Sequence, residues 1–152
     1  PYEILNHPEI FEAFETLKKT GKVRHLGLSS HTDPGGVLEA AVKAKVYSAA
    51  MVAYNMVNSP YVDNALAAAK KAGMGMISMK SARPFNFRAP RQTPSEHMAK
   101  LNAAIPGDLK PMQKAYIWNL RNANLTAAIS EMVNMDHVKD NLPLAGIREK
   151  AA

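Results

Sequence analysis

Cysteine is absent from this sequence of 152 residues. Its absence excludes disulfide bridges, thiolate metal sites and a cysteine nucleophile, and it leaves the redox compartment undetermined. No apolar run reaches the length of a membrane span, and no charged-then-apolar leader opens the chain, so we expect a soluble protein with the cytoplasm as its default location. Metal-ligand spacing, glycine-rich phosphate loops and a nucleophile elbow are also missing, and we therefore expect no metal site.

The composition is that of an ordinary globular protein, with 47% apolar and 21% charged residues. We expect one domain over residues 1–152 with a sizeable core. The formal net charge of +6 would allow a polyanionic partner, but the nineteen Lys and Arg residues are scattered along the chain instead of lying on one helix. We interpret them as solvated helix faces and expect neither nucleic acid nor a membrane as partner.

Helical patterns alternate with short apolar segments along the chain. Prolines and glycines mark the joints between them. The predicted helices cover residues 8–19, 37–46, 62–72, 94–104, 109–122 and 136–142, and the predicted strands cover 23–30, 47–55, 74–79 and 125–129. Alternation at this spacing predicts an α/β fold with four parallel strands joined by right-handed crossovers.

Four motifs occur in one order along the chain. They are Lys-x-Gly-Lys-Val-Arg-x-Leu-Gly-Leu-Ser-Ser-His at 19–31, Ala-Tyr-Asn at 53–55, Ala-Lys-Lys-Ala-Gly-Met-Gly-Met-Ile-Ser-Met-Lys at 69–80 and Asp-His-Val-Lys-Asp-Asn at 136–141. With these motifs, the sequence from about residue 8 to 141 resembles the C-terminal half of the aldo-keto reductase family. The resemblance implies strands five to eight of a (β/α)8 TIM barrel, which is half of the barrel. It also implies a family activity that moves a hydride between NADP(H) and a carbonyl or alcohol.

The resemblance places part of a nicotinamide site at the strand ends, where such barrels carry their chemistry. Ser29 and Ser30 match residues that hold the nicotinamide carboxamide, a task that suits hydroxyls because they donate and accept; capping of the following loop is an equally open alternative. Met79 stands where many members stack an aromatic ring on the nicotinamide, and Met51 stands where a Gln is common. Lys80 could lie beside a phosphate or substrate, or form a structural ion pair.

Three further positions of the resemblance concern the rest of the nucleotide. Arg83 opens a basic loop that runs to Arg91 and would pass over the pyrophosphate. The pair Asp140 and Asn141 matches the acidic residue and Asn that contact adenine. Glu131 and His137 stand where members that bind the 2′-phosphate supply Lys and Arg, and a carboxylate there would repel a phosphate. The NADP phosphate site therefore appears degraded, and NAD(H) is at least as plausible a cofactor.

The resemblance implies that the catalytic Asp, Tyr, Lys and His tetrad lies on the first four strands of the barrel, which this chain does not contain. We therefore assign no catalytic residue and expect the chain to be inactive alone. His31, Tyr54 and Asn55, at the predicted strand ends, are expected on the substrate side.

Four strands cannot close a barrel that needs eight, and open strand edges invite pairing. We expect either a missing N-terminal half, with this chain as a fragment, or a homo-oligomer that assembles the barrel. The alternative is a non-enzymatic binding or assembly module that uses residues Arg83 to Arg91 for an anionic partner, since a fold does not fix a function.

Overall fold

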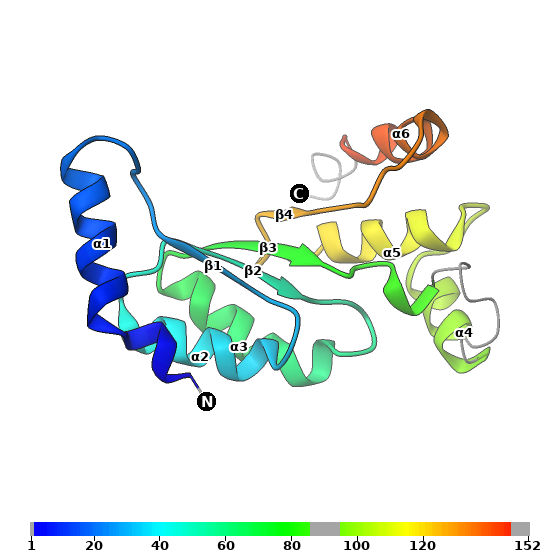
Figure 1. Cartoon of the computed structure of the whole chain (residues 1–152). Coiled ribbons are helices and arrows are strands. Elements are labelled where there is room, and N and C mark those ends of the chain that lie inside the picture. Colours follow the sequence, from blue (N-terminus) through cyan, green and yellow to red (C-terminus); the bar gives the residue numbers. More distant parts are fainter. Residues whose placement is uncertain (1, 86–94, 147–152) are drawn as a thin grey trace.

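The computed structural model describes residues 2–85 and 95–146 (Figure 1). Its four strands pair in the order β1-β2-β3-β4, and every pair is parallel. The elements are η1 Glu3–Asn6, α1 Pro8–Lys19, β1 Gly27–Ser30, α2 Pro34–Ala44, β2 Ala49–Ala53, α3 Ser59–Lys71, β3 Gly75–Met79, η2 Arg83–Phe85, α4 Ser95–Ala104, α5 Pro111–Leu120, β4 Ala127–Ala128, α6 Met135–Asn141 and η3 Leu142–Leu144. The predicted α/β fold is confirmed, and its arrangement is that of half a (β/α)8 barrel.

Local sequence signals set the helix boundaries. Proline occupies the first turns of α1 and α2, and the Asp33 side chain caps α2 by accepting a hydrogen bond from the Gly36 N–H at 3.2 Å. Gly21 and Gly73, which follow α1 and α3, take the left-handed conformation with φ of 71° and 84°. Lys45 takes the same conformation after α2, with φ of 58°.

The strands are shorter than the sequence predicts. The first was expected over residues 23–30, but its ladder begins where Gly27 pairs with Ala49, just after the Leu26 carbonyl accepts a hydrogen bond from the Ser48 N–H at 2.8 Å. The fourth pairs only through Ala127 and Ala128, opposite Ile77 and Ser78 of β3. Apolar composition thus located the strands but did not give their ends.

The two faces of the sheet differ in burial. Helices α2 and α3 pack against each other and cover one face, where Ala50, Val52 and Met76 are fully buried (Figure 1). The opposite face carries one register row of exposed Ser29 and half-buried Met51, Ile77 and Ala127. The side of β1 that bears Gly27 and Ser29 therefore lies on an open face.

The buried side chains form two clusters. The first lies between β1 to β3 and helices α2 and α3 and includes Leu38, Val62 and Leu66; the second surrounds Phe85 and Leu101, between η2, α4 and α5. Trp118 of α5 packs against both clusters. Its ring stacks on Tyr54 with centroids 5.6 Å apart, so α5 joins the sheet core to the cluster beyond the strand ends.

Candidate functional site

A hollow of about 730 Å³ lies at the carboxyl ends of β1, β3 and β4, which we call the rim hollow. Parallel strands bring these ends to one edge of the sheet. Its charged and polar lining consists of His31, Lys80, Ser81, Arg83, Glu131 and His137, and its apolar lining of Met79, Ala82, Met112, Tyr116 and Ile129. Four residues predicted for cofactor or substrate contact therefore meet here: His31, Met79, Lys80 and Arg83.

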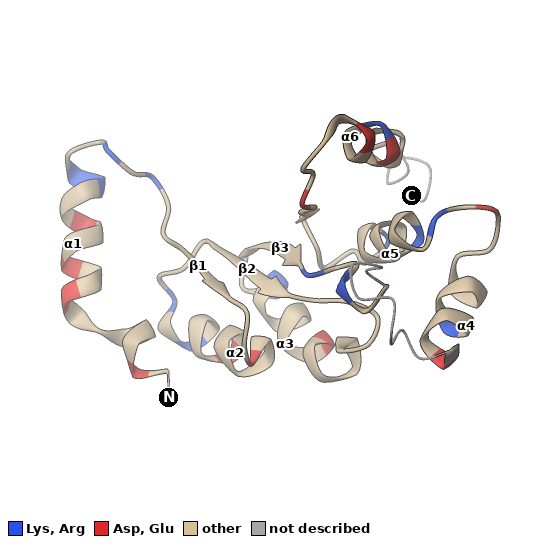
Figure 2. Cartoon of the chain, turned by 45° about the vertical axis from the view of Figure 1, so that its right-hand side comes forward, with Lys and Arg blue, Asp and Glu red and all other residues tan. Residues whose placement is uncertain are grey.

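The turn after β3 holds Lys80 at the edge of the rim hollow. Lys80 has φ of 57°, and its carbonyl accepts hydrogen bonds from the Arg83 N–H at 3.1 Å and from Asn55 Nδ2 at 3.3 Å. The buried hydroxyls of Ser78 and Ser81 lie 3.1 Å apart beneath it. Figure 2 shows the basic positions directly after β3. The backbone is thus fixed while the Lys80 side chain is exposed and can meet an anion.

Asn55 connects the turns that follow β2 and β3. Its Oδ1 accepts from the N–H groups of Val57 at 3.0 Å and Asn58 at 3.2 Å, while its Nδ2 donates to the Lys80 carbonyl. The residue is 7% exposed. The structure places Asn55, predicted on the substrate side, next to the rim hollow. Its hydrogen bonds there hold the Lys80 turn in place.

Tyr54 points away from the rim hollow, into the helical side of the sheet. Its hydroxyl donates to Asp63 at 2.6 Å and accepts from Asn122 Nδ2 at 2.7 Å. Burial raises the pKa of the Tyr54 phenol, and the Asp63 carboxylate raises it further. The structure does not bring this predicted substrate-side residue to the other site residues, because alternation along β2 directs its ring toward Trp118.

The two serines of β1 lie outside the lining of the rim hollow. Ser30 Oγ donates to the Thr32 carbonyl at 2.7 Å, which is the loop-capping role left open from the sequence. Ser29 is exposed on the open face of the sheet, in the row shared with Met51. A ligand that extends from the rim onto this open face would meet Ser29.

A second hollow of about 170 Å³ lies between α5 and α6, and we call it the α5–α6 hollow. It contains the predicted adenine pair Asp140 and Asn141, and it shares Met112, Glu131 and His137 with the rim hollow. The two hollows therefore adjoin, and Glu131 and His137 stand at their junction.

The adenine pair is engaged within the chain. The Asp140 carboxylate accepts hydrogen bonds from Lys110 Nζ at 2.8 and 2.6 Å. Asn141 Nδ2 donates to Ser130 Oγ at 3.1 Å. A ligand in the α5–α6 hollow would compete with these contacts or use the remaining lone pairs.

The sequence did not predict some residues of the site, and other predicted residues lie outside the described ranges. Met112 and Tyr116 reach the rim hollow from α5, for which the sequence predicted a helix but no site residue. Arg88 and Arg91 fall in residues 86–94, outside the described ranges, so only Arg83 of the basic loop is placed. In residues 2–85 and 95–146, no three His, Asp or Glu side chains cluster as metal ligands would, and no helix is long and apolar enough to cross a membrane.

The chain was compared with known proteins by sequence. A search of curated proteins found no significant match. The model of the aldo/keto reductase family matches residues 1–148, which is nearly the whole chain. Together with the parallel β/α arrangement, this match shows that the chain belongs to the aldo/keto reductase family.

Proposed function

We propose that this chain is the nucleotide-binding half of an NAD(P)-dependent aldo/keto reductase, corresponding to strands five to eight of the barrel. Family membership supports an oxidoreductase role. The observation that carries the finer proposal is the rim hollow, which gathers His31, Met79, Lys80 and Arg83 at the strand ends and adjoins the α5–α6 hollow. Such strand ends are where barrels of this kind hold their ligands.

The residues present suit a dinucleotide. Lys80 and Arg83 are cations at the rim and would hold the pyrophosphate, and the Met79 thioether, which is 4% exposed, would pack against the nicotinamide. Ser29 would hold the carboxamide from the open face of the sheet, whereas Ser30 lies in the row of buried Val52 and caps the following loop instead. Asn141, with Asp140 behind it, would hold the adenine in the α5–α6 hollow.

The cofactor supplies the hydride, and the residues of this chain bind and orient it. His31 lines the same hollow and stands on the substrate side, with Asn55 fixing the neighbouring turn. We place the acid-base tetrad on the other four strands of the complete barrel, so this chain alone should lack turnover.

Nucleotide titration tests the site. We expect NADH to bind saturably in calorimetry, and Lys80→Met and Arg83→Met, each made singly, to raise the dissociation constant by about 10-fold to 100-fold, since one hydrogen bond to a charged group contributes about 1.5–3 kcal/mol. Lys100→Met, on α4 and exposed, is the matched control and should change the constant less than about twofold. Equal effects of the rim variants and the control, or no saturable binding, would contradict the proposal.

Glu131 is expected to set the choice between NADH and NADPH. Two unit charges about 4 Å apart interact by about 1 kcal/mol in water, which is roughly fivefold in affinity. Glu131→Gln should therefore raise NADPH affinity at least about fivefold while leaving NADH affinity nearly unchanged, and the gain should shrink at high salt. Glu96→Gln, exposed on α4, serves as control. An equal gain for both nucleotides would show that Glu131 does not face the 2′-phosphate.

The open sheet face and the free edges of β1 and β4 are proposed to be covered by a second half-barrel, either another copy of this chain or an N-terminal half. Paired edges would hide backbone groups that are otherwise exposed. We expect sedimentation of the chain alone to show a dimer at micromolar concentration, with NAD(P)H oxidation of small aldehydes at the buffer rate. A compact monomer would contradict self-assembly, and clear turnover would contradict the placement of the tetrad elsewhere.

A further inference from the structure

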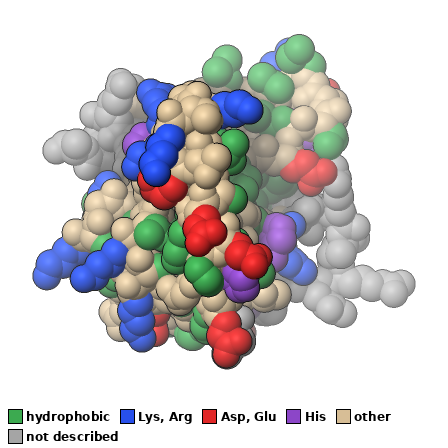
Figure 3. All heavy atoms as spheres, turned by 60° about the vertical axis from the view of Figure 1, so that its left-hand side comes forward, with side chains coloured by type: hydrophobic (Ala, Val, Ile, Leu, Met, Phe, Trp, Pro, Cys, Tyr) green, Lys and Arg blue, Asp and Glu red, His purple; other side chains and the backbone are tan. Residues whose placement is uncertain are grey.

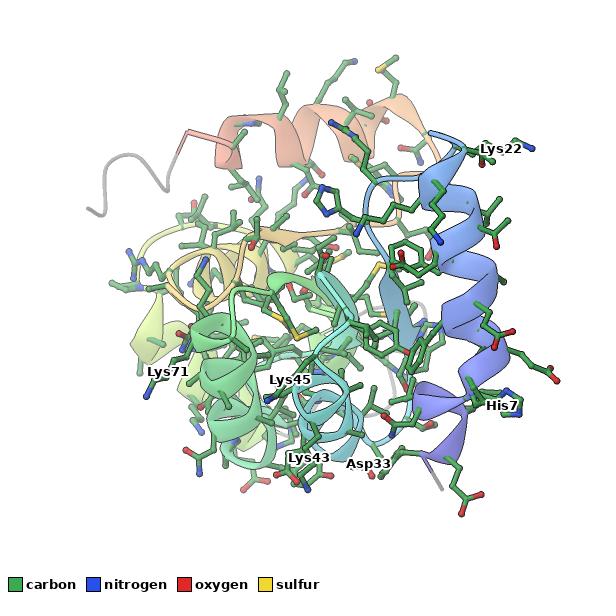
Figure 4. The ribbon with its side chains drawn as sticks, turned by 90° about the vertical axis from the view of Figure 1, so that its left-hand side faces the viewer. His7, Lys22, Asp33, Lys43, Lys45 and Lys71 are labelled. Atoms are coloured by element: carbon green, nitrogen blue, oxygen red, sulfur yellow. The ribbon has the colours of Figure 1, made fainter. Side chains whose placement is uncertain are left out.

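Nine of the nineteen Lys and Arg residues lie at helix ends and in the connections that precede the strands, at the edge opposite the rim hollow. Figure 4 labels four of them, Lys22, Lys43, Lys45 and Lys71, which are spread across the face in view. All nine are exposed. We call this set the basic end: Lys18, Lys19, Lys22, Arg24, Lys43, Lys45, Lys70, Lys71 and Arg121. Whole helices separate these groups in the sequence, and for that reason the cations looked scattered. Parallel pairing places all the helix-to-strand connections at one edge of the sheet, so the cations share that edge in the fold.

Acidic residues do not neutralise the basic end. The segments 16–26, 40–49, 67–76 and 120–128 contain no Asp or Glu, and none of the nine cations forms an ion pair within the described ranges. The acids of α1, Glu9, Glu12 and Glu15, lie on earlier turns than Lys18 and Lys19. In Figure 3 the blue side chains lie mainly to the left and top and the red ones mainly toward the centre and lower right. Several kT of positive potential is expected over such a surface.

Helix stabilisation explains only part of the basic end. Lys and Arg in the last turn of a helix offset its dipole, and five of the nine are in last turns. Lys22, Arg24 and Lys45 lie in the connections instead. Lys45 adopts the left-handed conformation that Gly21 and Gly73 adopt at the equivalent turns, a conformation that costs a non-glycine residue about 1 kcal/mol or more. A cation thus occupies a position where glycine would be more stable.

We propose that the basic end binds the phosphate backbone of a nucleic-acid duplex without reading its sequence. Lysine ammonium groups act as point charges toward phosphates, and seven of the nine cations are lysines. Tyr47, the one Phe, Tyr or Trp of the four segments, is half-buried with its hydroxyl bonded to the Leu5 carbonyl. The exposed His25 ring, 3.4 Å from Ser48 Oγ, is then the single small ring available, too little for a platform on which successive bases stack. Leu17 is the only exposed large apolar side chain of the four segments. A surface that docks on a membrane presents several such side chains.

The test measures binding of a mixed-sequence DNA duplex of about 20 base pairs by fluorescence anisotropy across a salt series. We expect a micromolar dissociation constant at low salt, unaffected by saturating NADH because the rim hollow lies at the opposite edge. Lys22→Gln with Lys45→Gln should weaken binding about tenfold and reduce the slope of log affinity against log salt by roughly 2. The matched pair Lys100→Gln with Lys139→Gln removes the same charge elsewhere and should leave the slope unchanged.

Thermal unfolding of all variants, measured by circular dichroism, confirms that they remain folded. The same proteins are mixed with a single strand of equal length and with vesicles of phosphatidylcholine and phosphatidylserine. Preference for the duplex supports the proposal. Absence of duplex binding at low salt, equal weakening by both pairs, or binding to vesicles alone would overturn it, the last in favour of an anionic membrane.

Discussion

Replacing Asn55 by alanine is expected to lower the free energy of unfolding by about 3 kcal/mol, because three hydrogen bonds at about 1 kcal/mol each lose their side-chain partner. Two of them close the turn after β2, through the N–H groups of Val57 and Asn58, and the third reaches the Lys80 carbonyl across to the next strand. The residue is 7% exposed, so water replaces these contacts poorly. Urea unfolding followed by circular dichroism measures the loss.

The same substitution should also weaken nucleotide binding, if the rim hollow is the nucleotide site. The Lys80 turn would lose its link to β2 while the cation itself remains. Asn64→Ala is the matched control, since Asn64 is exposed on α3 and alanine favours helix; it should shift stability by less than about 0.5 kcal/mol. If Asn55→Ala unfolds at the control's urea midpoint, the bridge between the two turns does not contribute to stability.

The order and type of the elements could be predicted from the sequence because each is signalled locally. Pro8 and the Asp33 cap start helices, Gly21 and Gly73 end them, and the short apolar runs between them have strand length. Strand lengths could not be predicted in the same way. They depend on which residues of two strands come into register, and β4 pairs through two residues although β3 has five.

The sequence predicted which residues lie at the carboxyl ends of the strands. It did not predict to which face of the sheet each of their side chains points. His31, Met79 and Lys80 follow their strands to one edge, as parallel pairing requires. Tyr54 also ends its strand, but its ring turns to the helical face, and a shift of one residue reverses that choice. The basic end shows the same limit, because cations far apart in sequence meet only through topology.

Removing the Phe85 side chain is expected to have the largest effect on stability, about 3–5 kcal/mol for Phe85→Ala, with about 2–5 kcal/mol for Leu66→Ala. Both side chains are fully buried, Leu66 in the sheet cluster and Phe85 in the cluster of η2, α4 and α5. Against a total stability of about 5–15 kcal/mol, either change removes a large fraction.

The two substitutions should differ in where the chain opens. Because the clusters share Trp118 but few other side chains, Phe85→Ala should speed amide hydrogen exchange mainly in α4 and α5, and Leu66→Ala mainly in α2 and α3. Leu142→Ala, which truncates a side chain that is 70% exposed, should change neither region. Uniform acceleration by both core variants would show that Trp118 couples the clusters into one cooperative unit, in which case the rim hollow would have the stability of the whole sheet.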